Sequence, residues 1–137
     1  MPGLRRESCS DCSRIVYERG PLRMIEAAMA PRETGGVEEF FRSLEGSPTG
    51  RQQLADIAVR FEAYARDDTL SFPRQINDLA DGLRELKVGK IRLPFFETDH
   101  LGITAARLTH AFIKKTENTP RQEIDRARWV RGKDIGL

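Results

Sequence analysis

The last third of the chain runs from a basic, strand-patterned segment straight into a capped helix, and this order restricts the possible folds more than any other feature. Residues 91–96 alternate side chains with the period of two that is typical of a β-strand. Residues 105–113 follow as a further strand after a loop. Thr119 is a suitable N-cap and Pro120 suits the first helical position, so we expect the C-terminal helix to begin there.

The first half of the chain predicts two consecutive helices. Apolar residues recur at positions i, i+3, i+4 and i+7 within residues 37–44, which is the pattern of one helical face. Gly46 ends this helix. Thr49 and Gln52 then have the capping-box spacing for a second helix, which ends at residues 66–68.

The resulting order is helix, helix, strand, strand, strand, helix, because residues 83–86 and a turn at Gly89 precede the strand at 91–96. This order favours an α+β domain. We expect a small antiparallel sheet with an αα-hairpin on one face and a C-terminal helix. The helices should cover the apolar face and leave the face of Arg92 for function. Pro94 removes a ladder donor and indicates an edge strand or a bulge.

Residues 1–34 have the least regular pattern, since glycine and proline interrupt them repeatedly. We expect a leader that is partly disordered or that adds one strand to the sheet. Residues 14–18 and 24–30 are the two segments with strand character. The folded domain is expected to span residues 35–137.

Length and composition indicate one small domain in the cytoplasm. The 137 residues are enough for one core. No apolar run approaches the roughly 18 residues of a membrane span, and no secretory signal is recognisable. Cys9 and Cys12 form a C-x-x-C pair, but its flanks do not resemble a redox motif and the two histidines lie far along the chain. We therefore expect neither a metal nor a cofactor.

Positive charge is concentrated in the second half of the chain. Residues 84–137 hold 12 Lys and Arg against 7 Asp and Glu, whereas residues 1–83 hold 11 against 14. Such an imbalance indicates nucleic acid or an acidic partner, although a solvated charged face produces the same count. The basic half fits a polyanion such as RNA.

Several sequence blocks, in the same order, resemble the phage-derived branch of the RelE/HigB toxin superfamily. Residues 81–87 (DGLRELK) resemble its D-G-x-x-E-L-R motif, and Arg92 falls where that branch has the arginine of a Y-R-v-f-y strand. The likeness covers roughly residues 35–131. Its other parts are the helix entry at 36–40 (GVEEF), the strand at 108–115 (LTHAFIKK), the cap at 116–120 (TENTP), and Glu123, Ile124 and Ala127 of the last helix.

The resemblance implies a type II toxin of a toxin–antitoxin pair, with ribosome-dependent cleavage of mRNA as its activity. It implies a small antiparallel sheet with two helices on one side and a C-terminal helix. The implied partners are mRNA on the ribosome and a HigA-like helix-turn-helix antitoxin, which binds the toxin and represses the shared operon. The sequence departs from the pattern at Lys87, where the motif has arginine, and at Ile91, where it has an aromatic residue.

RNA cleavage needs no metal when the ribose 2′-hydroxyl attacks the adjacent phosphorus, because preorganised cations stabilise the added negative charge. Arg92 is the first candidate for this phosphate clamp, since a guanidinium meets two phosphate oxygens at once. Lys87, Lys114 and Lys115 are candidates for adding positive charge near the phosphate. Neighbouring cations lower the pKa of a lysine, so one of them is a possible base or acid. Strand alternation sends Lys114 and Lys115 to opposite faces.

Other residues have two interpretations each. His110 has the intrinsic pKa for proton transfer, but a histidine in a strand is more often a hydrogen-bonded structural residue. Glu85 is expected to orient Lys87 or Arg92 through a salt bridge. Trp129, among arginines, can stack on RNA or face an acidic antitoxin segment, yet packing is the expected role. The candidate RNA-binding residues are Arg84, Arg121 and Arg128.

Two other functions stay open. A degenerate, non-catalytic toxin would keep only the antitoxin interface, and the missing aromatic residue at position 91 favours it. A small DNA-binding regulator would need a helix-turn-helix, which the first two helices resemble. The acidic residues of the helix at 49–68 count against the regulator.

Overall fold

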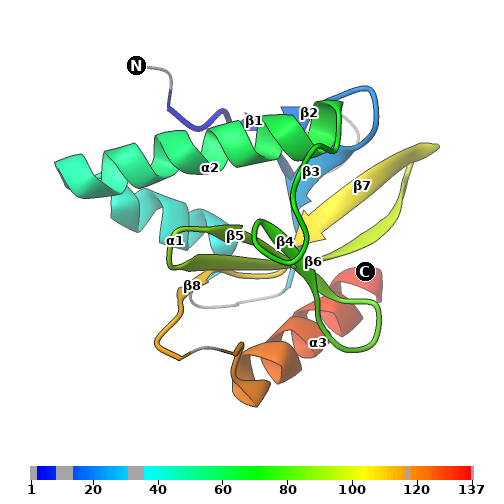
Figure 1. Cartoon of the computed structure of the whole chain (residues 1–137). Coiled ribbons are helices and arrows are strands. Elements are labelled where there is room, and N and C mark those ends of the chain that lie inside the picture. The colour runs from blue at the N-terminus through cyan, green and yellow to red at the C-terminus, as the bar shows by residue number, and fades with distance from the viewer. Residues whose placement is uncertain (1–2, 9–13, 31–35, 117, 137) are drawn as a thin grey trace.

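The computed structural model describes residues 3–8, 14–30, 36–116 and 118–136. In these residues, three helices and eight strands form an α+β fold around one sheet (Figure 1). The helices are α1 (Val37–Leu44), α2 (Pro48–Arg66) and α3 (Arg121–Ile135). The strands are β1 (Glu7–Ser8), β2 (Ile15–Arg19), β3 (Met24–Ala27), β4 (Ile76–Asp78), β5 (Arg84–Val88), β6 (Ile91–His100), β7 (Ile103–Leu108) and β8 (Phe112–Ile113).

The sheet is mixed rather than antiparallel. Its strand order is β1-β2-β3-β7-β6-β5-β4, and β8 pairs with β6 beside this path. β3 and β7 run parallel, with Ile25 opposite Ala106. The expectation of an antiparallel sheet is wrong at this pair. The pairing joins segments far apart in the sequence, so no local pattern indicates it.

The N-terminal residues contribute more to the sheet than the single added strand that was expected. β2 and β3 form a hairpin, and β1 pairs with β2 at the edge of the sheet. Tyr17 of β2 and Ile25 of β3 belong to the main hydrophobic core, so this hairpin is part of the folded unit. Residues 1–2, 9–13 and 31–34 of the expected leader lie outside the described residues.

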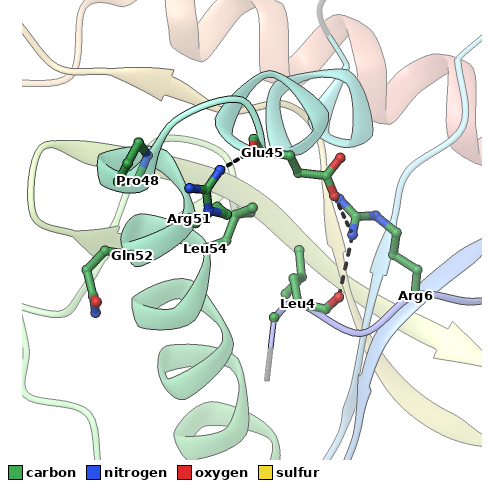
Figure 2. Close-up of a pocket in the computed structure, with 8 residues that line it drawn as sticks. Leu4, Arg6, Glu45, Pro48, Arg51, Gln52 and Leu54 are labelled. Carbon is green, nitrogen blue, oxygen red and sulfur yellow. Dashed lines mark hydrogen bonds and ion pairs between the residues drawn. The ribbon is translucent and has the colours of Figure 1, made fainter. Parts of the chain in front are cut away.

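Helices α1 and α2 follow one another and cover one face of the sheet (Figure 1). α2 is capped by Ser47, whose side chain accepts a hydrogen bond of 3.0 Å from the backbone N–H of Gly50. The cap therefore lies two residues before the expected Thr49. At the start of α2, the Arg51 guanidinium donates to the carbonyl oxygen of Glu45 at 3.0 Å, which ties the helix to the connecting turn (Figure 2).

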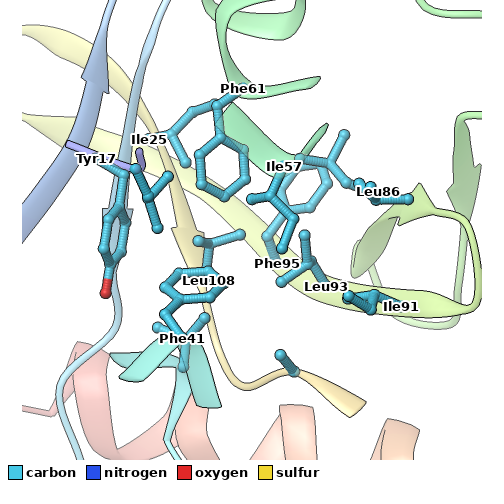
Figure 3. Packing of buried hydrophobic residues seen from close by; sticks show 14 of the residues in the cluster. Tyr17, Ile25, Phe41, Ile57, Phe61, Leu86, Ile91, Leu93, Phe95 and Leu108 are labelled. Atoms are coloured by element: carbon cyan, nitrogen blue, oxygen red, sulfur yellow. The ribbon is translucent and has the colours of Figure 1, made fainter. Parts of the chain in front are cut away.

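The main core lies between the sheet and these two helices (Figure 3). Leu93 and Phe95 of β6 point toward the helices because alternate residues of a strand face the same way. Phe41 of α1 meets the ring of Tyr17 in a T-shaped contact with 5.1 Å between centroids. Each large apolar side chain buried here contributes about 1.5–3 kcal/mol.

Helix α3 covers part of the opposite face. Leu83, Phe96 and Ala127 form a second, smaller core there. The N-cap of α3 is Pro120 rather than Thr119. Thr119 is not available as a cap because its hydroxyl donates to the buried carboxylate of Glu85 at 2.7 Å. The sheet face that was expected to stay open is thus partly closed by α3.

Pro94 lies within β6, between the paired strands β5 and β7. β7 pairs with residues 95–100 of β6 and β8 pairs with residues 91–92, so residues 109–111 bulge out between them. The backbone N–H of Thr109 donates to the Pro94 carbonyl at 2.9 Å. In an antiparallel strand the N–H and C=O of one residue point to the same side. The position where Pro94 lacks an N–H therefore faces the bulge, as its carbonyl does. Of the two expectations for Pro94, the bulge is therefore confirmed and the edge strand is wrong. The bulge also divides the single strand expected at 105–113 into β7 and β8.

Candidate active site

A cavity of about 330 Å³ opens where α3 begins, on the sheet face opposite α1 and α2. This volume falls in the range of small-molecule sites. Strands β4, β5 and β6 line one side, and the residues that lead into α3 line another. The lining residues are Asn77, Asp78, Leu79, Ala80, Glu85, Lys87, Arg92, Asn118, Thr119 and Ile124.

The cavity brings together two of the cations named from the sequence. Lys87 of β5 and Arg92 of β6 are direct cross-strand partners, so both side chains project from the same face. Arg92 is only 6% exposed, yet it lines this polar cavity and lies outside the hydrophobic core clusters. An anion in the cavity would therefore meet a guanidinium and an ammonium group side by side.

The backbone of the β5–β6 turn fixes the Arg92 guanidinium. Its Nη1 donates to the carbonyl of Gly89 at 2.8 Å and to that of Ile91 at 3.1 Å. Within the described part of the chain, its Nε and Nη2 have no hydrogen-bond partner. One edge of the planar group is thus held while donors remain for an incoming anion.

Glu85 is a buried carboxylate in the same cavity, with 2% of the residue exposed. The expected salt bridge to Lys87 or Arg92 is absent among the described residues. The partner of Glu85 is Thr119, whose hydroxyl donates to Oε1. A hydrogen bond from a neutral group, instead of an ion pair, keeps this carboxylate beside the two cations.

His110 is fully buried and is not among the cavity residues. Its Nε2 lies 2.9 Å from Oε1 of Glu123, and its Nδ1 lies 3.0 Å from Oγ1 of Thr109. Burial and, to a smaller extent, the charge of Arg126 lower its pKa to about 4, although the hydrogen bond and the charge of Glu123 oppose this shift. His110 thus joins the bulge to α3 as a neutral residue and does not reach the cavity.

Lys114 and Lys115 follow β8 at the neighbouring end of the sheet. Phe112 of β8 is paired with Arg92, and the N–H of Lys114 donates to the carbonyl of Lys90 at 2.8 Å. Alternation assigns Lys114 to the face of Arg92 and Lys115 to the other face. Neither lysine lines the cavity, so both stand beside it rather than in it.

The candidate RNA-binding arginines are dispersed. Arg84 is on the face of α2, where its Nε donates to Asp78 at 2.8 Å and its Nη1 to the hydroxyl of Tyr64 at 3.3 Å. Arg128 binds Asp81 at 2.6 Å and Asp125 at 2.8 Å, which fastens the loop after β4 to α3. Arg121 is exposed at the start of α3, next to the cavity.

Sequence reasoning did not find a buried ion network at the other end of α3. Asp134 binds Arg14 and Arg107, and Arg107 also binds Glu26 at 2.7 Å. Glu26 further lies 2.7 Å from Nδ1 of His100. These charged residues lie in segments with ordinary strand and helix patterns. Their spacing in the sequence therefore does not indicate that they form ion pairs with one another.

A larger cavity, of about 560 Å³, lies on the other side of the molecule, between the N-terminal segment and the start of α2 (Figure 2). Leu4 and Leu54 give it an apolar wall, and Arg6 is paired with Glu38 and Glu45 at 2.7 and 3.3 Å. It holds no carboxylate or cation of the sequence motifs. The smaller cavity is therefore the better candidate for chemistry.

Among the described residues, no three or more His, Cys, Asp and Glu side chains form a group that could hold a metal ion. Cys9 and Cys12 lie outside those residues. No helix in the described ranges is both long and apolar enough to cross a membrane.

The sequence model of one family, described as phage-derived protein Gp49-like (DUF891), matches residues 40–130. The chain belongs to this Gp49-like family. The family is associated with toxin–antitoxin systems, which implies an antitoxin partner. The matched range includes the cavity residues from β4 to α3. No curated protein matches the chain.

Proposed function

We propose that this chain is the toxin of a toxin–antitoxin pair and that it cleaves mRNA on the ribosome without a metal. The observation that carries the proposal is the cavity in which Lys87, Arg92 and Glu85 come together. Membership of the Gp49-like family supports the class of function. The two cations and the carboxylate supply the chemistry that the reaction needs.

In the proposed reaction, the ribose 2′-oxygen attacks the neighbouring phosphorus, the bond from phosphorus to the 5′-oxygen breaks, and a 2′,3′-cyclic phosphate forms. Arg92 and Lys87 stabilise the negative charge that grows on the phosphate oxygens. Glu85 accepts the 2′ proton, since the other carboxylate of the cavity, Asp78, is paired with Arg84. The Lys87 ammonium donates the proton that the leaving 5′-oxygen takes up.

We also propose that the chain is a RelE/HigB-type toxin whose partner is a HigA-like helix-turn-helix antitoxin. The sequence blocks that resemble that superfamily support this, as do the two consecutive helices on one sheet face and the C-terminal helix on the other. The site of action would be the cytoplasm, where translating ribosomes are found.

The alternative of a degenerate toxin depended on the missing aromatic residue at position 91. Ile91 is 1% exposed and belongs to the main core, on the face opposite Arg92. A side chain at this position would therefore point away from the cavity. Position 91 therefore gives no support to that alternative, and the cleavage experiment below decides between a degenerate and an active toxin.

The first prediction concerns induced expression in bacteria. Wild type is expected to stop growth and to produce discrete cuts inside translated codons, mapped by primer extension. Arg92→Ala should lower cleavage by about 100-fold or more, because one preorganised charge contact is lost. Glu85→Gln should also lose cleavage, while Arg42→Ala, which removes an exposed cation of α1 far from the cavity, should retain it.

Soluble yield and thermal melting of each variant will separate loss of chemistry from loss of folding. If folded Arg92→Ala protein cuts mRNA as well as wild type, the proposed clamp is wrong. If wild type neither stops growth nor cuts mRNA, the proposed activity itself is wrong.

A further inference from the structure

We propose that the outer face of α3 binds single-stranded RNA beside the cavity, with Trp129 stacking on a base. This inference rests on the proposed RNA cleavage, and it adds a binding surface outside the cavity. It also gives a role to the one tryptophan of the chain.

Trp129 is exposed rather than packed. Packing was the expected role, yet 46% of the residue is accessible to solvent, and neither core cluster on this sheet face includes it. The ring lies on the side of α3 that faces away from the sheet, since Ala127 and Val130 are the buried residues of this turn. An exposed indole offers a large apolar face to a planar partner.

The tryptophan belongs to a stripe that starts at the cavity. Arg121, Asp125, Trp129 and Lys133 follow one another at i+4 spacing, and all are exposed. The stripe is about 18 Å long at the usual helical rise. Its first member lies two residues after Thr119, which lines the cavity. An RNA strand that leaves the cavity along α3 would therefore pass over Trp129.

The neighbours of Trp129 leave room for a base. Nζ of Lys133 lies 5.6 Å from the centroid of the indole ring, on one flank. In the next turn of the helix, a Cβ at Gly132 would meet no atom within 4 Å. Helical side chains lean toward the N-terminus, so a larger residue at position 132 would extend over the turn of Trp129. Glycine is a poor helix former, and here it keeps that approach open.

The charges of α3 favour a polyanion on this face. Glu123 is engaged by buried His110, and Asp134 is buried with Arg14 and Arg107. The third acid, Asp125, is paired with Arg128 at 2.8 Å. The outward field therefore comes mainly from Arg121 and Lys133. Lys133 lies beside the ring and Arg121 lies eight residues before it, beyond Asp125. Cations near an exposed aromatic ring favour the backbone and bases of a single strand.

The test uses the single tryptophan as the probe. A twelve-nucleotide 2′-O-methyl oligoadenylate, which lacks the attacking hydroxyl, is titrated into the full-length protein at low salt. We expect saturable quenching of Trp129 fluorescence. Binding of the same oligonucleotide with a fluorescein label is followed by anisotropy. Trp129→Ala should weaken it by about tenfold, and Gly132→Leu should weaken it by covering the ring.

Trp129→Phe is the matched control, because it keeps a stacking ring and should retain most of the binding. If the oligonucleotide binds in a way that requires Arg92 but does not quench Trp129 fluorescence, this inference is wrong. The proposed cleavage is not affected by that result. Absence of any saturable binding would also overturn it. If an acidic antitoxin peptide quenches Trp129 and the oligonucleotide does not, the face belongs to the antitoxin. The proposed cleavage is judged separately by the mRNA cuts in cells.

Discussion

At the scale of single residues, burial decides which of the sequence candidates is available for chemistry. His110 has a suitable intrinsic pKa, but it is fully buried and holds Glu123 of α3. Glu85 was expected to orient a cation, yet it faces the cavity with a hydroxyl as its partner. A sequence shows the type and spacing of residues. Whether a residue is accessible to a substrate depends on how segments far apart in the sequence pack around it.

The second prediction follows from the lowered pKa of His110. In the unfolded chain this side chain binds a proton near pH 6.5, and in the folded protein it does so near pH 4. The unfolded state therefore holds more protons in this window, and stability falls as the pH drops from 6.5 to 4. The loss should be on the order of 3 kcal/mol, measured by urea unfolding across that range.

The control is His110→Gln, whose amide replaces Nε2 as a donor to Glu123 but does not titrate. Its stability should change less between pH 6.5 and 4 than that of wild type. Parallel pH profiles for the two proteins would show that His110 does not cause the effect.

At the scale of elements, the helices and the β5–β6 hairpin follow from local patterns. The apolar period predicted α1, the capping-box spacing predicted α2, and the turn at Gly89 predicted the hairpin that pairs Lys87 with Arg92. The cap of α2 is Ser47 rather than Thr49 because the Ser47 side chain accepts from the N–H of Gly50. Thr119 does not cap α3 because its hydroxyl donates to Glu85. The bulge at residues 109–111 was indicated by Pro94, although its location on the adjacent strand was not.

The third prediction compares two helical glycines. A Cβ at Gly50 would overlap the carbonyl oxygen of Leu44, whereas a Cβ at Gly132 would meet nothing within 4 Å. Gly50→Ala should lower the free energy of unfolding by about 1–3 kcal/mol, because the α1–α2 connection must shift. Gly132→Ala should raise it by about 0.5–1 kcal/mol through better helix propensity.

Thermal melting of the two alanine variants checks this contrast. A stabilised Gly50→Ala protein would mean that the connection between α1 and α2 is looser than the structure shows. Gly132→Ala also tests whether the glycine is kept for access to Trp129 at the expense of stability.

At the scale of the whole molecule, the buried ion network connects the N-terminal strands to the C-terminal helix. Asp134 of α3 binds Arg14 just before β2, Arg107 of β7 and the backbone N–H of Met29 after β3. Neither this network nor the parallel β3–β7 pair could be predicted, because the pair and the contacts of Asp134 with Arg14 and Met29 join segments far apart in the sequence. Local periodicity contains no information about such distant contacts.

The fourth prediction is that Asp134→Ala destabilises the fold strongly. The substitution leaves the guanidinium groups of Arg14 and Arg107 buried without this carboxylate, which should cost about 3–5 kcal/mol. Asp125→Ala, which removes an exposed ion pair with Arg128 on the same helix, should cost less than about 1 kcal/mol. Chemical denaturation of both variants measures the difference, and equal losses would contradict the role of the network.

The parallel pair of β3 and β7 has a consequence for biosynthesis. β3 is translated early, but β7 emerges only after α1, α2 and the strands β4 to β6 have been made. A nascent chain thus cannot complete its sheet until most of the sequence has left the exit tunnel, and α3, which closes the cavity, appears later still. Non-local pairing of this kind slows folding, so a newly made copy stays incompetent until its synthesis is almost finished.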